Sequence, residues 1–312
     1  MNSSYMLASA GSGARALALP HSARDQISRR DFLAGAAAAA AAGLFAPARA
    51  FSAESSSPSK WRMRLSTSSI LFKQLPIEQA CERTAALGFE AIDIWCAYDN
   101  CPHLDDVLKR LGPEGLKELL AKHKLKLYAF STYIGGYAKY AELLGKAGGG
   151  VAIVGSPGPC PPAELTAKMR SFIESLKPQV ELAGENNSWL AIENHGSSLL
   201  DSLDSFKAFV DNNNSPRLGL ALAPYHVQAG NASVEQAIAI CGSQLLFFYA
   251  WQHQSDIGQL PGHGPTDFKP WLRSLAKVNY KRYVNPFMHG HVETDAMSAA
   301  LLKARDYLKA GA

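Results

Sequence analysis

The chain has few cysteines, and they form no metal-binding motif. Its 312 residues include five cysteines, and no two of them have Cys-x-x-Cys spacing. A structural zinc cluster is therefore not indicated. The odd number leaves at least one thiol unpaired unless two chains are linked. Cys96 and Cys101 are the only close pair, and the sequence leaves open whether they form a disulfide.

The chain also lacks a large excess of charge of either sign. The whole sequence has 31 Lys and Arg and 27 Asp and Glu, a formal net charge of +4. Residues 1–50 contribute five arginines and two aspartates, so without them 26 basic and 25 acidic residues remain, a net charge of +1. This balance argues against a nucleic acid as partner.

The N-terminal region lacks the long apolar run of a membrane anchor. The pair Arg29-Arg30 precedes an alanine-rich stretch that ends in small residues at Ala48 and Ala50. A spanning helix needs about 20 strongly apolar residues, whereas paired arginines and a small-residue end resemble a bacterial twin-arginine signal. We therefore expect residues 1–50 to be cleaved after Ala50. Cleavage would leave no stable anchor and a mature protein in the periplasm or otherwise exported.

From residue 61 to 312, short apolar runs alternate with longer segments of helical period. The preceding residues 51–60 are rich in serine and are predicted to be a flexible linker. Strands are predicted at 63–68, 91–95, 125–131, 150–154, 189–193, 218–223, 245–251 and 282–287. Helices are predicted at 77–87, 113–122, 137–146, 162–183, 202–210, 233–240, 268–278 and 294–308.

Eight strands alternating with eight helices over about 250 residues are typical of the α/β class and its (β/α)8 TIM barrel. The strands are almost continuously apolar, as expected for parallel strands covered by helices. A doubly wound open sheet is the rival fold, but it commonly has a glycine-rich phosphate loop after its first strand. Here the first strand ends in STSSILF, without that loop. We therefore expect a single-domain barrel over 61–312.

Polar side chains follow the predicted strands where barrel enzymes carry their chemistry. Glu193 ends the apolar run WLAI, and His226 follows a Pro-Tyr pair at a strand end. Function explains both better than helix capping does, whereas His195 and His253 are explained equally well as solvated loop histidines. The strand-end residues of a chemical kind are Asp93, Trp95, Ser131, Thr132, Tyr133, Glu193, Asn194, His195, Tyr225, His226, Gln252, His253, Asn285, His289 and His291.

Four segments resemble one family in the right order: AALGFEAIDIW, WLAIENHG, LGLALAPYH and LPGHGPTDFKPWLRSL. The chain from residue 51 onward is similar to the xylose isomerase-like TIM barrels, the sugar phosphate isomerase/epimerase group. The resemblance implies one divalent cation held by a Glu after strand five, an Asp after strand six, a His after strand seven and a Glu after strand eight. A second His lies three residues beyond that Asp. It also implies that carboxylates move a proton between adjacent substrate carbons.

Carried over to this sequence, that ligand set is incomplete. Glu193 matches the strand-five Glu and His226 the second His, but Ala223 stands at the Asp position. The strand-seven His falls on Trp251 or Gln252, and the strand-eight Glu on Asn285. Alanine cannot coordinate a metal, and amides are weak ligands beside carboxylates.

Two outcomes follow. A zinc or manganese site is rebuilt from Glu193, His226, His289 and His291, with Gln252 as a neutral donor. Alternatively the pocket is metal-free and binds a sugar through aromatic faces, imidazoles and amides. The substrate-binding candidates are Trp95, Tyr133, Asn194, His195, Tyr225, Trp251, Gln252 and Asn285.

We expect an exported carbohydrate-active isomerase, epimerase or lyase that abstracts a proton next to a carbonyl of a sugar or keto-sugar. Glu193 is the expected base or metal ligand, and His226 the acid or oxyanion stabiliser. The alternative is a non-catalytic sugar-binding protein on a barrel that has lost its metal site. A hydrolase with two carboxylates is less well supported, because only Glu193 and Asp93 stand at strand ends. The sequence leaves a homo-oligomer open.

Overall fold

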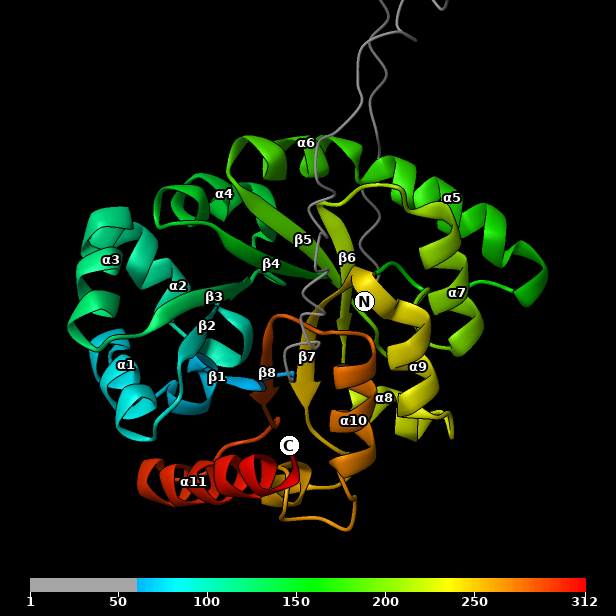
Figure 1. The fold of residues 1–312 in the computed structure, drawn as a ribbon. Helices are drawn as coiled ribbons and strands as arrows, with labels where there is room; N and C mark the ends of the chain where they lie inside the picture. The colour runs from blue at the N-terminus through cyan, green and yellow to red at the C-terminus, as the bar shows by residue number, and fades with distance from the viewer. Residues whose placement is uncertain (1–60) are drawn as a thin grey trace, which may run out of the picture. The chain divides into compact units, whose positions relative to one another are not determined.

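The computed structural model describes residues 61–312. Eight parallel strands form a closed barrel in chain order, and β8 pairs with β1 to close it (Figure 1). The strands are β1 (Arg64–Ser68), β2 (Ala91–Trp95), β3 (Lys126–Ser131), β4 (Gly150–Gly155), β5 (Ser188–Glu193), β6 (Leu218–Leu222), β7 (Leu245–Ala250) and β8 (Tyr283–Pro286). The predicted (β/α)8 barrel is confirmed.

Helices surround the strands on the outside of the barrel (Figure 1). They are α1 (Ile77–Ala86), α2 (His103–Asp106), α3 (Gly112–Lys122), α4 (Gly136–Lys146), α5 (Leu165–Ser175), α6 (Lys177–Glu185), α7 (Leu203–Asn212), α8 (Pro224–Ala229), α9 (Val234–Cys241), α10 (Lys269–Lys277) and α11 (Thr294–Gly311). None of these helices is long and apolar enough to cross a membrane.

Three α-helical segments differ from the sequence-based expectation, and one of them is the four-residue α2, which was not predicted. The single helix predicted at 162–183 is divided into α5 and α6, because Pro178 has no N–H to continue the ladder of α5. The short α8 was not predicted. Pro224 occupies its first position, where a missing N–H costs nothing, and six residues are too few for a helical period to show.

Successive side chains of a strand point alternately outward and inward, and so contribute to two apolar layers. On β2, Ile92 and Ile94 belong to the layer between strands and helices, whereas Ala91 and Trp95 belong to the barrel interior. The interior combines small residues such as Ala191 with large rings from β7. Side chains therefore fill the barrel interior, and a ligand can bind only at one of the two ends of the barrel.

All five cysteines are free thiols, and four of them are buried. Cys96 and Cys101 are therefore not bridged in this structure. The Cys101 thiol lies 3.4 Å from Nδ1 of His103 instead.

Candidate active site

The carboxyl ends of the strands form a rim with two neighbouring pockets. The first, of about 390 Å³, includes Tyr133, Glu193 and His195 together with the loop after β4. The second, of about 450 Å³, includes His226, His289 and aromatic side chains from the loops after β6 and β7. Eight of the predicted strand-end or substrate-binding residues line these two pockets: Tyr133, Glu193, His195, Tyr225, His226, Trp251, His253 and His289.

Glu193 is the last residue of β5 and is half-buried in the wall of the first pocket. Burial raises the pKa of its carboxyl to about 7, and the charge of Asp93 acts in the same direction. Hydrogen bonding with Tyr133 partly opposes this rise. A carboxyl group with a pKa near 7 can accept and release a proton at neutral pH.

His195 and His226 form a ring pair between the two pockets. Their ring centroids are 4.0 Å apart, and His195 lines the first pocket while His226 lines the second. Burial, with smaller contributions from the neighbouring His195, His289 and His253, lowers the pKa of His226 to about 3. His226 is therefore a neutral imidazole near pH 7, able to donate one N–H bond and accept another.

Aromatic side chains build the wall of the second pocket. Tyr225 stacks on Trp251 with centroids 4.5 Å apart, and the His289 ring meets Trp251 edge-on at 5.1 Å. The buried Trp251 indole N–H has no hydrogen-bond partner among the described residues. Such an orphaned donor costs about 1–3 kcal/mol, so a ligand or water oxygen reaching it would be stabilising.

A polar layer lies in the barrel interior around Asp93. Its carboxylate accepts hydrogen bonds from Ser68 Oγ (2.8 Å), Trp95 Nε1 (2.5 Å) and Ser131 Oγ (3.0 Å). Asn285 donates to Ser68 Oγ at 2.9 Å. Burial raises the pKa of Asp93 to about 7, although these bonds oppose the rise.

Tyrosine hydroxyls lie near the two carboxyls. The hydroxyls of Tyr133 and Tyr249 are 3.0 Å apart. Burial raises the pKa of Tyr249, and the charges of Glu193 and Asp93 act in the same direction. Tyr249 is therefore close to both carboxyls, and Ser131 donates to Asp93 at 3.0 Å.

Sequence reasoning missed Tyr249, and it missed Ser68, which donates to Asp93. Ser131 was recognised only as a strand-end residue. Sequence reasoning also set aside the loop after β4, where Ser156 donates to Ser198 Oγ at 2.9 Å in the wall of the first pocket. The segment GSPGP directly after strand four was the available signal.

The three amides expected to orient substrate are buried and bonded to the protein itself. Asn194 accepts from the Ala223 backbone N–H at 2.6 Å, and Gln252 accepts from that of Thr266 at 2.8 Å. Asn285 accepts from Ser66 Oγ at 2.9 Å. These amides hold the rim in shape and do not line either pocket.

The predicted metal ligands are only partly brought together. His226 and His289 line the same pocket, but Glu193 lines the neighbouring one. His291 turns to Gln74, whose Nε2 lies 2.6 Å from its Nδ1. Among residues 61–312, no three His, Cys, Asp or Glu side chains are placed to hold a metal ion. With Ala223 and a fully bonded Asn285 at two ligand positions, these residues do not fit the family's usual metal site.

The comparisons with known proteins agree with this architecture. The model of the xylose isomerase-like TIM barrel family matches residues 81–309, and that of the twin-arginine translocation signal matches residues 26–46. The chain belongs to the xylose isomerase-like TIM barrel family, and it carries a twin-arginine signal, which directs export to the periplasm or beyond. No curated protein matches the chain.

Solved structures, two of them of sugar epimerases, share the fold at low identity. The apo form of the 3-keto-D-glucoside 4-epimerase YcjR of E. coli is 16% identical with a TM-score of 0.62, covering 78% of this chain and 100% of its own. The D-psicose 3-epimerase of Clostridium cellulolyticum H10 with D-tagatose gives 16% and 0.62, covering 80% and 99%. The IOLI protein with a bound zinc atom gives 16% and 0.62, covering 80% and 98%.

Proposed function

We propose that the protein is an exported enzyme that isomerises or epimerises a sugar or keto-sugar by abstracting a proton next to a carbonyl. The carrying observation is Glu193, a carboxyl with a pKa raised to about 7 at the barrel mouth, next to the ring pair of His195 and His226. The sugar epimerases among the structural neighbours support the substrate class.

In the proposed reaction the Glu193 carboxylate takes a proton from the carbon next to the carbonyl. The electron pair of the broken C–H bond moves to the carbonyl oxygen and produces an enediolate. The neutral imidazole of His226 donates an N–H hydrogen bond to that oxygen, and the His195 ring packs against it at the divide between the pockets. Protonated Glu193 then gives its proton to the former carbonyl carbon, while the proton of the neighbouring hydroxyl moves to the former carbonyl oxygen. The neighbouring carbon becomes the new carbonyl, which completes an isomerisation; an epimerisation needs a second acid on the opposite face of the enediolate.

The experiment is a screen of sugars and keto-sugars in D₂O, followed by ¹H NMR for the loss of a C–H signal. On the substrate so found, Glu193→Gln is expected to lower kcat by about 10²–10⁴. The exposed Glu181 in α6 provides a matched control. Glu181→Gln makes the same chemical change at a residue that lines neither rim pocket. A Glu193→Gln enzyme with full activity would sink the proposal.

A second candidate is a non-catalytic sugar-binding protein, favoured by the loss of carboxylates at Ala223 and Asn285. It predicts saturable sugar binding by calorimetry, with the sugar recovered unchanged and undeuterated. Stoichiometric zinc or manganese in the purified protein would count against this candidate and would show a ligand set that differs from the one seen here.

A further inference from the structure

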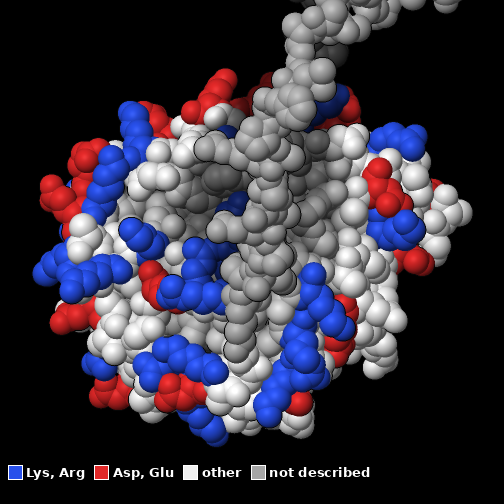
Figure 2. Space-filling model, in the orientation of Figure 1, with Lys and Arg blue, Asp and Glu red and all other residues white. Residues whose placement is uncertain are grey.

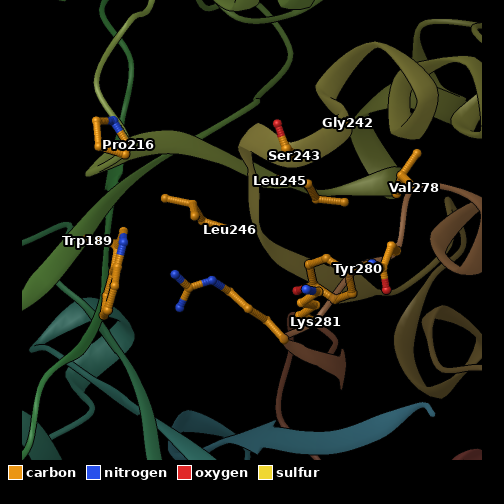
Figure 3. A pocket seen from close by; sticks show the side chains of 11 residues that line it. Trp189, Pro216, Gly242, Ser243, Leu245, Leu246, Val278, Tyr280 and Lys281 are labelled. Carbon is orange, nitrogen blue, oxygen red and sulfur yellow. The ribbon is translucent and has the colours of Figure 1, made fainter. Parts of the chain in front are cut away.

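The opposite end of the barrel, where the strands begin, contains a cavity of about 410 Å³ that we call the basal pocket. It shares no lining residue with the two rim pockets. Figure 3 shows Trp189 and Leu246 on one side of it and Leu245 and Tyr280 on the other. Its wall also includes Arg282. The basal pocket is thus a site of its own.

Three arginines around this end have their guanidinium carbons over aromatic rings. The guanidinium carbons of Arg217 and Arg282 lie 4.7 and 4.6 Å from the ring centroid of Trp189. That of Arg64 lies 4.5 Å from the centroid of Tyr283. None of the three forms a salt bridge with a carboxylate of residues 61–312.

Positive charge is concentrated at this end, although the chain as a whole is nearly neutral. Among the described residues that begin a strand or directly precede one, four are basic and one is acidic. They are Arg64, Lys126, Arg217, Arg282 and Glu90. Glu90 pairs with Arg62 at 3.3 Å. Figure 2 shows several Lys and Arg side chains towards the middle of the drawn face, mainly on its left and lower sides.

The stacked arginines keep their hydrogen-bond donors for another partner. A guanidinium that stacks through its face keeps its in-plane N–H groups, which match the oxygens of a carboxylate or phosphate. Arg217 uses one of these groups on the Ser188 carbonyl at 3.2 Å. The charges of Arg64 and Arg282 both act on the buried Tyr280 hydroxyl, where they lower its pKa against the larger effect of burial. Arg217 and Arg282 lie over one indole ring, and two like charges on the same ring favour an anion nearby.

We propose that the basal pocket binds a small organic oxyanion, a carboxylate or phosphate group carried on an apolar body. Arg282 lines the pocket and binds the oxyanion, and Arg217, which lies over the same indole but outside the lining, adds positive charge nearby. Trp189, Leu245 and Leu246 contact the body of the ligand. This site is independent of the proposed sugar chemistry at the rim.

The test is a titration of the protein, purified after expression with its own leader, with benzoate, phenyl phosphate and the neutral benzamide. Binding is followed by the indole N–H resonance of Trp189 in ¹H-¹⁵N NMR spectra, assigned with Trp189→Phe. At least one of the two anions is expected to shift this resonance saturably, while benzamide does not. If neither anion shifts this resonance at concentrations up to about 20 mM, any binding free energy is weaker than about 2.5 kcal/mol. That result would overturn the proposal.

Substitutions then locate the anion. Arg282→Gln is expected to weaken binding about tenfold or more, because a charge-assisted bond is lost. Arg273→Gln on the exposed face of α10 removes the same charge elsewhere and is expected to change binding less than about twofold. If Arg282→Gln does not fold by circular dichroism, Arg282→Lys takes its place and is expected to weaken binding, because lysine keeps the charge but not the planar fork of donors. Unchanged binding in the folded variant, or a shift of Trp95 and Trp251 in place of Trp189, contradicts a basal site.

Discussion

Asp93 and Glu193 show how much of a residue's chemistry comes from neighbours that are distant in the sequence. Glu193 was predicted as a functional carboxyl because it ends an apolar strand. Asp93 was placed at a strand end, yet it lies in the middle of β2 and is fully buried. Its partners Ser68 and Ser131 come from β1 and β3, and no local pattern shows that these strands meet around one carboxyl.

The raised pKa of Asp93 predicts a stability that falls as the pH rises. A carboxyl with a pKa of about 7 in the folded state and about 4 in the unfolded state keeps its proton longer when folded. Between about pH 4 and 7 the folded state therefore binds more protons, and the free energy of unfolding decreases by a few kcal/mol in total. Asp93→Asn is neutral at every pH and should flatten this decrease.

Urea unfolding at pH 5, 6, 7 and 8 measures the effect. The exposed Asp201 offers a control, since Asp201→Asn should leave the wild-type slope unchanged. Equal slopes for wild type and Asp93→Asn would show that Asp93 titrates like an exposed carboxyl.

At the scale of elements, periodicity located the strands well because parallel barrel strands are buried on both faces. The second strand was predicted at 91–95 and is observed at Ala91–Trp95, and the eighth was predicted at 282–287 and is observed at Tyr283–Pro286. The rim loops were less predictable. The amides of Asn194 and Gln252 bond to backbone groups that come together only when the loops fold.

Contact between β6 and β7 predicts a large difference between two glycines. A Cβ added at Gly219 would lie 2.3 Å from the carbonyl oxygen of Gln244 and 2.7 Å from Leu246 Cγ. Gly219→Ala should therefore cost about 1–3 kcal/mol or more through overpacking. A Cβ at Gly184, in α6, meets nothing within 4 Å. Gly184→Ala should stabilise the fold by about 0.5–1 kcal/mol.

Both variants are compared with wild type by urea unfolding at one pH. Opposite signs are expected, because one substitution meets packed backbone and the other only increases helix propensity. A Gly219→Ala protein as stable as wild type would mean that β7 can shift away at little cost.

At the scale of the whole molecule, the two barrel ends differ in chemistry. The rim combines a carboxyl, neutral histidines and aromatic faces, whereas the basal end concentrates arginines. No disulfide links the strands or helices of the barrel. All five thiols are free, and four of them are buried in the apolar core. A barrel without disulfides can fold in a reducing compartment, which suits a pathway that exports proteins already folded.

The last prediction concerns the leader, residues 1–50. Arg29 and Arg30 lie within the matched twin-arginine signal, outside the described residues. Lysine keeps the charge but not the planar fork of arginine donors, so replacing both by lysine should leave the full-length precursor in the cytoplasm. Wild type should be recovered from the exported fraction beginning at Phe51, and Arg24→Lys, which lies before the matched segment, should be exported normally. Normal export of the double variant would mean that export does not depend on the arginine pair. The inference that the protein folds with free thiols in a reducing compartment before export would then lose its basis.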